Sequence, residues 1–208
     1  MNDQPPPTLQ QLFGGAIVAH IPPQFTDVRF LTHFFFYLYR TQNDDIREIP
    51  DNQEVFVDTH TDQSIVVEIL ELVNEASNEE AASYHFSSVA FDNDAEDTTI
   101  VQQTGILTPA EVPKLPSNTL MYFATGQQMV SKFNERDSSA RNLVNIFLAV
   151  FRLPQHQTDL VITYNLPILI GETSSSRSYA QEGNVHVGYE EFKRILASVQ
   201  IVDWSLFG

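Results

Sequence analysis

Apolar residues gather in short runs along the chain, and several of these runs have the composition of β-strands. They are rich in β-branched and aromatic residues, and residues that favour turns separate them. The pattern predicts strands at 12–23, 54–58, 97–107, 142–154 and 159–167. Residues 63–72 are ambiguous, since their β-branched start favours a strand and their end could be helical, and we favour a strand. We interpret residues 119–134 as a hairpin with its turn near Gly126. Pro154 and Pro167 are expected to end the strands that contain them.

Two further segments have the features of helices. Ser77, followed three residues later by Glu80, resembles a capping box and predicts a helix over 78–91. Residues 189–200 place apolar side chains at the spacing of an amphipathic helix that packs on a sheet. These side chains are Phe192, Ile195, Leu196 and Val199. Strands joined by short turns, with only two or three helices, indicate an α+β fold on a mostly antiparallel sheet.

Length and composition indicate a single domain, residues 1–208. Hydrophobic residues make up 42% of the 208 residues, which is enough for a packed core. Residues 1–8 are polar and rich in proline, so we expect a frayed tail there, and we expect a flexible loop at 171–186. No apolar run reaches the roughly 20 residues that span a bilayer, and no signal peptide is recognisable. These features predict a soluble protein kept inside the cell.

Negative charge is concentrated in one part of the sequence. The formal net charge is −16, and residues 44–97 hold sixteen of the 27 acidic residues with a single base, Arg47. Such a field repels nucleic acid and anionic lipid and attracts a basic partner. The alternative interpretation is a solvated acidic face that keeps the protein soluble.

Sequence motifs of common enzymes and metal sites are absent or incomplete. The chain has no cysteine and no P-loop, GxGxxG, HExxH or GxSxG motif, so we expect neither a catalytic site nor a cofactor. Asp58, His60 and Asp62 would share one face of a strand and could hold a metal, but an exposed acidic strand end has the same pattern. Residues 92–103 begin like a calcium loop but lack its glycine and its final glutamate. The residues therefore predict an acidic protein with a basic protein partner.

The segment IPDNQEVFVDTHTDQSIVVEILELV, residues 49–73, resembles the signature of the Ran guanine nucleotide release factor (Mog) family. LFGGAI near the start, and RLPQHQTDLVITYNLP and FKRILASVQIVDWSLFG near the end, are similar to the same family in the same order. The resemblance covers residues 12–208. It implies an αβα sandwich, with an antiparallel sheet flanked by helices, similar to the PsbP proteins of photosynthesis.

The resemblance also implies a function. Members of the family bind the small GTPase Ran, promote release of its bound GTP and support nuclear protein transport, without a catalytic triad or cofactor. We therefore expect Ran as the partner, alone or with a Ran-binding protein, and a monomer found in nucleus and cytoplasm. Nucleic acid and membranes are not expected partners. One alternative is an acidic binding module or assembly factor that shares only the fold. The other is a hydrolase whose catalytic residues are among the many acidic residues.

The family contacts Ran through an acidic patch that includes the two carboxylates of a PDxQE motif, which falls on Asp51 and Glu54 here. Pro50 suits the second position of a β-turn that would hold these carboxylates together. The resemblance thus predicts a partner-binding site at the entrance of a strand, with other acids flanking it. The predicted site residues are Asp45, Asp51, Gln53, Glu54, Asp58 and Asp62. The alternative role for Asp51 and Glu54 is turn capping and solvation.

Residues Val28–Gln42, VRFLTHFFFYLYRTQ, have no counterpart in the family pattern, and removing them restores an uninterrupted match. Every valine codon begins with GT, glutamine can be encoded by CAG, and the phenylalanine and tyrosine codons between them supply pyrimidines. We hypothesise that this insertion is a translated, unspliced intron, which sequencing of spliced messenger RNA would test. The alternative is a genuine strand or helix with a hydrophobic partner surface. The run is too short for a membrane anchor.

Overall fold

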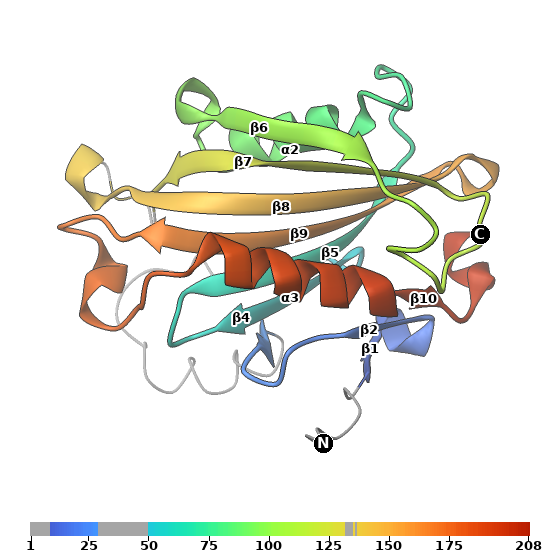
Figure 1. Cartoon of the computed structure of the whole chain (residues 1–208), viewed down its shortest axis with the longest axis horizontal. Helices are drawn as coiled ribbons and strands as arrows, with labels where there is room; N and C mark the ends of the chain where they lie inside the picture. The colour runs from blue at the N-terminus through green and yellow to red at the C-terminus, as the bar shows by residue number, and fades with distance from the viewer. Residues whose placement is uncertain (1–8, 29–49, 132–134, 136) are drawn as a thin grey trace.

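The computed structural model describes residues 9–28, 50–131, 135 and 137–208. Its centre is a seven-stranded antiparallel sheet in the order β3-β4-β5-β9-β8-β7-β6, and a second sheet has the order β1-β2-β10 (Figure 1). The strands are β1 (Leu9–Leu12), β2 (Ile17–His20), β3 (Thr26–Asp27), β4 (Gln53–Asp58), β5 (Gln63–Glu71), β6 (Ile100–Ile106), β7 (Leu120–Val130), β8 (Asn142–Leu153), β9 (Thr158–Leu169) and β10 (Gln200–Ile201). The α-helices within the described residues are α2 (Ala81–Asp92) and α3 (Val185–Ser198). The 3-10 turns are η1 (Phe13–Gly15), η2 (Glu96–Thr98), η3 (Ser138–Ala140), η4 (Pro154–His156), η5 (Ser175–Ser178) and η6 (Trp204–Phe207).

The two helices cover opposite faces of the large sheet. Alternate side chains of a strand point to opposite faces, and β8 shows this clearly. Ile146 and Leu148 belong to a core cluster with Phe86 of α2. Phe147, which lies between them in the sequence, stacks on Phe192 of α3 with 5.7 Å between ring centroids. Figure 1 shows α3 in front of the sheet and α2 behind it, which confirms the predicted α+β, αβα architecture.

The helices do not begin at the predicted residues. α2 begins at Ala81, three residues later than predicted. α3 begins at Val185, four residues earlier than predicted. The reason is Asn184, whose side chain accepts hydrogen bonds from the backbone N–H groups of His186 and Val187 at 3.0 and 3.2 Å. Such a cap satisfies backbone donors that the first turn of a helix leaves free. Among the described residues, neither helix is long and apolar enough to cross a membrane.

The hairpin predicted over 119–134 is wrong, because β7 is one strand that continues through Gly126. A Cβ atom at Gly126 would lie 2.1 Å from the carbonyl oxygen of Ile100 and 2.8 Å from Cζ of Phe86. β6 and α2 both approach β7 at this point, so any side chain would push them away. The glycine is needed for close packing and not for a turn.

The two prolines of the β8–β9 hairpin differ in their effects. β8 ends directly before Pro154, as predicted. β9 continues through Pro167 to Leu169, so the predicted end at Pro167 is wrong. The pairing of β8 with β9 is irregular between Leu143 and Val144, opposite this proline. Proline has no backbone N–H, and a strand tolerates it at such an irregularity because no hydrogen bond to the neighbouring strand is required there.

The prediction of a single strand over 12–23 is wrong, because the chain reverses direction within this region. β1 and β2 are an antiparallel pair joined by η1. Gly14 and Gly15 make the reversal, with φ angles of 68° and 96° that glycine adopts without steric cost. β2 also pairs with β10, so the first and last of the described strands, β1 and β10, belong to one sheet.

A buried charged cluster joins the segment before α2, and α2 itself, to the β8–β9 hairpin. The carboxylate of Asp159 is fully buried and lies 3.0 Å from Arg152 Nε, 3.0 Å from His85 Nε2 and 3.1 Å from the N–H of Val73. Arg152 also donates to the carbonyl of Val73 and, at 2.8 Å, to Asn78 Oδ1. Burial raises the pKa of Asp159, but the hydrogen bonds from His85, Val73 and Arg152 outweigh this effect and hold the pKa below its usual value.

The segment predicted to be a flexible loop, 171–186, contains η5 and the first residues of α3. Ser176 of η5 is fully buried and its hydroxyl donates to Asp62 Oδ2 at 2.6 Å. This contact ties the segment to the turn between β4 and β5. The flexibility of the segment stays a prediction.

Most of the predicted insertion, Val28–Gln42, lies outside the described residues, as does the predicted tail, 1–8. β3 and β4, on either side of the insertion, are antiparallel neighbours with Asp27 opposite Phe56. Deleting the insertion leaves ten residues, 43–52, between these strands, which is enough for a loop between antiparallel neighbours. We expect the deletion variant to fold and to give more soluble protein, because an aromatic run is removed. Circular dichroism and the soluble fraction after expression measure both effects, and loss of the sheet signal would contradict the prediction.

Candidate functional site

The start of β4 lies at a surface pocket of about 310 Å³. Three segments that are far apart in the sequence form this pocket, namely η1, the turn before β4, and η6. The lining residues are Phe13, Gly14, Pro50, Asp51, Gln53, Glu54 and Leu206. Asp51, Gln53 and Glu54 of the predicted partner-binding set therefore share one concave site.

Asp51 is exposed on a tight turn directly before β4. The backbone N–H of Gln53 donates to the carbonyl of Pro50 at 2.9 Å, so Pro50 holds the first position of a β-turn and Asp51 the second. The prediction that Pro50 takes the second position is wrong by one residue. Asn52 fixes the turn to β5, because its Nδ2 donates to the carbonyl of Ile69 at 3.0 Å. Asp51 is thus a solvent-exposed carboxylate on a turn that hydrogen bonds hold in place.

Glu54, in contrast, is only 2% exposed. Its Oε1 accepts a hydrogen bond of 2.7 Å from the backbone N–H of Phe13. Phe13 and Gly14 have φ angles of 50° and 68°, so η1 begins in a conformation that is costly for a residue with a side chain. A hydrogen bond to a buried carboxylate is a strong one and offsets such a cost. Glu54 therefore holds η1 at the pocket and does not present a second exposed charge beside Asp51.

Gln53 faces the other side of the sheet, because neighbouring residues of a strand alternate. Its Nε2 donates to Glu68 Oε1 on β5 at 2.5 Å. Burial raises the pKa of Glu68, and the hydrogen bond from Gln53 acts in the opposite direction. Gln53 thus joins β4 to β5 at the edge of the pocket.

The structure separates Asp58 and Asp62 from Asp51. Asp58 is the last residue of β4, four residues beyond Glu54, which is about 13 Å along an extended strand. Asp62 lies in the turn that follows. The prediction that Asp58 and Asp62 flank Asp51 is therefore wrong, because β4 carries them to the opposite end of the hairpin. Asp45 lies outside the described residues.

Asp58 and Asp62 stabilise the turn between β4 and β5. Asp58 is 6% exposed and accepts hydrogen bonds from the N–H of His60 at 2.9 Å and from the hydroxyl of Thr61 at 2.7 Å. Asp62 has a φ angle of 61°, and its Oδ2 accepts a hydrogen bond from the hydroxyl of Ser176. Within the described ranges, no group of three histidine or acidic side chains is arranged to hold a metal ion.

Phe13, Gly14 and Leu206 belong to the pocket but were not predicted as site residues. The glycine pair after Phe13 was a signal of an unusual backbone, and Leu206 lies in the apolar closing segment. Each of these signals has a local explanation in a turn or in the core. Only the folded chain brings them to the turn before β4.

Comparison with known proteins identifies the family. Residues 39–167, more than half of the chain, match the family described as Ran-interacting Mog1 protein. The chain belongs to this family. Within the Mog1 family, a Ran guanine nucleotide release factor of Danio rerio is 35% identical over 202 residues, which cover 95% of this chain and 98% of that protein. The nuclear import protein mog1 of Schizosaccharomyces pombe is 31% identical over 204 residues, which cover 95% of this chain and 98% of that protein.

A solved structure agrees with this membership. The crystal structure of the Saccharomyces cerevisiae Ran-binding protein MOG1p has a TM-score of 0.65 and 25% sequence identity to this chain. The similarity covers 97% of this chain and 98% of the yeast chain. The Mog1 fold therefore extends over nearly the whole protein, as the resemblance in sequence predicted.

Proposed function

We propose that this Mog1-family chain binds the GTPase Ran and promotes release of its bound GTP, in support of nuclear protein import. The observation that carries the proposal is the nearly full-length match to relatives named as a Ran guanine nucleotide release factor and as a nuclear import protein. In this proposal the chain is a regulator of a GTPase, not an enzyme, and it acts as a monomer in nucleus and cytoplasm.

The proposed contact with Ran is the pocket at the start of β4. Asp51 supplies an exposed carboxylate there, on a chain whose net charge is −16. Charge of this kind chiefly speeds the encounter with a basic surface and fixes orientation. Phe13 and Leu206 supply apolar area in the same pocket. Apolar contacts that exclude water at the centre of an interface usually contribute most of the binding free energy.

Release of GTP requires more than contact with Ran. A ligand shifts an equilibrium only by its difference in affinity for the two states, so this chain must bind GTP-free Ran more tightly than GTP-loaded Ran. The coupling is reciprocal, so GTP must weaken the complex by the same factor. A tenfold preference corresponds to about 1.4 kcal/mol.

The test is release of a fluorescent GTP analogue from purified Ran, with and without this protein. We expect the chain to accelerate release, and we expect Asp51→Lys to lower its apparent affinity for Ran at least tenfold. Asp51 is exposed, so the substitution leaves the fold intact. The matched control is Glu172→Lys, which makes the same change of charge at another exposed position. This control should accelerate release of GTP from Ran as much as the unmodified protein does.

Two results would count against the proposal. If Asp51→Lys and Glu172→Lys behave alike, the pocket is not the contact. If the unmodified protein does not accelerate release, and neither does the variant without Val28–Gln42, this chain shares the Mog1 fold without the activity.

A further inference from the structure

β6 forms one edge of the seven-stranded sheet, and no strand of the described residues pairs with its outer side. Its sequence, IVQQTGI, has no charged residue and no proline. Every residue of β6 except Gly105 is exposed, and the exposed fractions of Ile100 and Ile106 are 59% and 66%. Proteins usually protect such an edge with charge, proline or a covering segment, because its free N–H and C=O groups pair readily with another strand. Within the described residues, β6 has no charge, proline or covering segment, and its one irregularity is the shift of pairing register between Val101 and Gln103.

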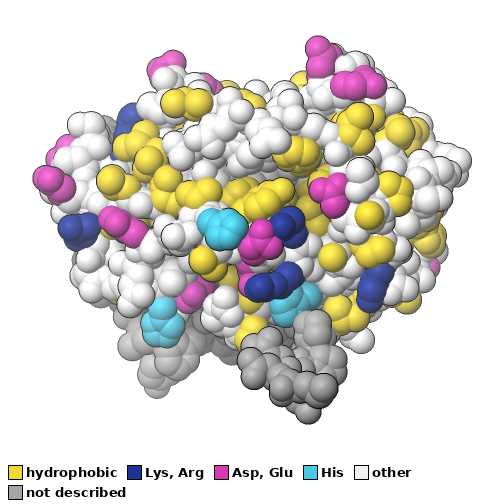
Figure 2. Space-filling model, in the orientation of Figure 1, with side chains coloured by type: hydrophobic (Ala, Val, Ile, Leu, Met, Phe, Trp, Pro, Cys, Tyr) yellow, Lys and Arg dark blue, Asp and Glu magenta, His cyan; other side chains and the backbone are white. Residues whose placement is uncertain are grey.

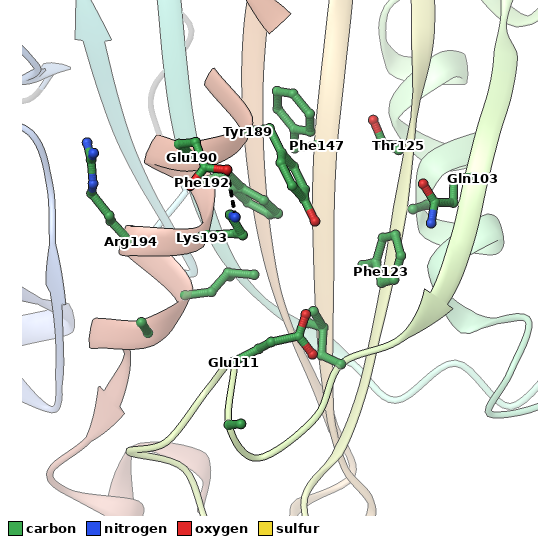
Figure 3. Close-up of a pocket in the computed structure, with 15 residues that line it drawn as sticks. Gln103, Glu111, Phe123, Thr125, Phe147, Tyr189, Glu190, Phe192, Lys193 and Arg194 are labelled. Atoms are coloured by element: carbon green, nitrogen blue, oxygen red, sulfur yellow. Dashed lines mark ion pairs between the residues drawn. The ribbon is translucent and has the colours of Figure 1, made fainter. Parts of the chain in front are cut away.

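A groove of about 500 Å³ lies beside β6 on the face of the sheet that carries α3 (Figure 3). Phe123 and Phe147 come from β7 and β8, and Tyr189 and Phe192 come from α3. The groove reaches the edge of the sheet, because Gln103 of β6 is one of its lining residues. Figure 2 shows hydrophobic side chains gathered in a band across this face of the molecule. A strand added to β6 would therefore have apolar surface beside its side chains on this face.

Acidic side chains lie at the end of this edge where β6 begins. α2 ends at Asp92, and three further exposed acids lie between it and β6; these are Asp94, Glu96 and Asp97. The sequence contains no lysine or arginine between Arg47 and Lys114. Basic side chains at that end of an added strand would therefore lie near exposed acids.

The groove itself offers one more acid. Its two cations are already paired, Lys193 with Glu190 at 2.7 Å and Arg194 with Glu191 at 2.9 Å. Glu111 lines the groove, and its carboxylate accepts hydrogen bonds from Thr108. Among the described residues, no salt bridge joins Glu111 to a base.

We propose that the outer edge of β6 binds an extended, basic segment of a partner protein as an eighth strand. Alternate side chains of a strand face opposite sides. Apolar residues of the segment enter the groove over Phe123, and lysine or arginine residues at the end of the segment beside Ile100 lie near Asp94, Glu96 and Asp97. This is strand addition, in which the backbone supplies affinity and alternate pockets supply specificity.

A second copy of this chain does not fit the edge. Each copy carries a net charge of −16 and the same acids beside β6, so pairing two copies would bring like charges together. The edge is also far from Asp51, because β4 and β6 are five strand spacings apart, or about 24 Å. Both surfaces can therefore be occupied at the same time.

The probe is a fluorescein-labelled nonapeptide of alternating lysine and valine, and its comparison is the same peptide with serine in place of valine. Fluorescence anisotropy measures affinity, and amide hydrogen exchange locates the bound strand. We expect the lysine–valine peptide to bind at least tenfold more tightly than the lysine–serine peptide, and to slow exchange at β6. Equal binding of the two peptides, which would indicate charge attraction alone, or slowed exchange at another strand would overturn the proposal.

Gln103→Lys tests the groove, because Gln103 is an exposed residue of β6 that lines it. We expect this variant to lose at least tenfold affinity for the lysine–valine peptide. Gln181→Lys makes the same change at an exposed position outside the groove and should bind like the unmodified protein. Equal affinity of the two variants would overturn the proposal. So would a dimer, seen by sedimentation, in which β6 amides are protected without peptide.

Discussion

Replacing Asp159 with alanine is expected to lower the free energy of unfolding by about 3–5 kcal/mol, the usual cost of removing one partner from a buried ion pair. The carboxylate is fully buried, and Arg152, which it pairs with at 3.0 Å, is only 4% exposed. Without Asp159, the guanidinium of Arg152 stays buried without its counter-ion, and the N–H of Val73 loses its acceptor. Urea denaturation of the purified protein measures the loss. Asp97→Ala, at an exposed acid, should change stability by less than about 0.5 kcal/mol. Equal midpoints for the two variants would contradict this account.

The pH dependence of this contribution has a defined sign. The pKa of Asp159 is lower in the folded protein than in the unfolded chain, where it is about 3.9. An acid with a lowered pKa stabilises the fold above the unfolded-state pKa, and the stabilisation is lost as the pH falls through the folded-state pKa. We therefore expect the difference between the unmodified protein and Asp159→Ala to be largest near neutral pH and to narrow below about pH 4. Urea titrations at pH 7 and pH 3 measure it.

Glu54→Ala is expected to affect both stability and binding, although Glu54 is almost fully buried. The substitution leaves the N–H of Phe13 without its carboxylate acceptor, and hydrogen bonds to charged groups contribute about 1.5–3 kcal/mol. We expect a loss of about 2 kcal/mol, measured by thermal unfolding. Because η1 supplies part of the pocket, we also expect weaker binding to Ran.

Glu54→Gln is the matched variant, because its amide oxygen still accepts the hydrogen bond from Phe13. It should lose about half as much stability as Glu54→Ala and retain more Ran binding. Asp51→Lys differs from both, since it should weaken binding while unfolding at the same temperature as the unmodified protein. If Glu54→Ala unfolds and binds like the unmodified protein, Glu54 does not position η1.

The sequence was sufficient to predict most strands and the sheet with two covered faces, because buried strands are recognisable from their apolar residues. The alternation in β5 and the apolar runs of β8 and β9 follow from sheet geometry alone. Gly126 was misinterpreted because the sequence does not distinguish a glycine in a turn from a glycine that is needed where neighbouring elements pack closely. The distinction depends on Ile100 and Phe86, which come from other elements.

The candidate site was only partly predictable for the same reason. The turn that carries Asp51 is local, so the motif located it to within one residue. Nothing local shows that Glu54 reaches Phe13, 41 residues away in the sequence, or that Leu206 joins them. Asp58 and Asp62 are close to Asp51 in sequence but not in space, because an extended strand separates its two ends by its full length.

The pocket beside Asp51 also has a consequence for how the protein is made. Its walls come from residue 13 at one end of the chain and from residue 206 at the other. During synthesis, Asp51 leaves the ribosome long before Leu206 does, so a nascent chain that already displays Asp51 has no complete pocket. The proposed contact surface is therefore complete only after the segment around Leu206 has emerged and folded. A fusion partner attached directly to the C-terminus would lie next to this surface, whereas one attached through a long linker would leave it free.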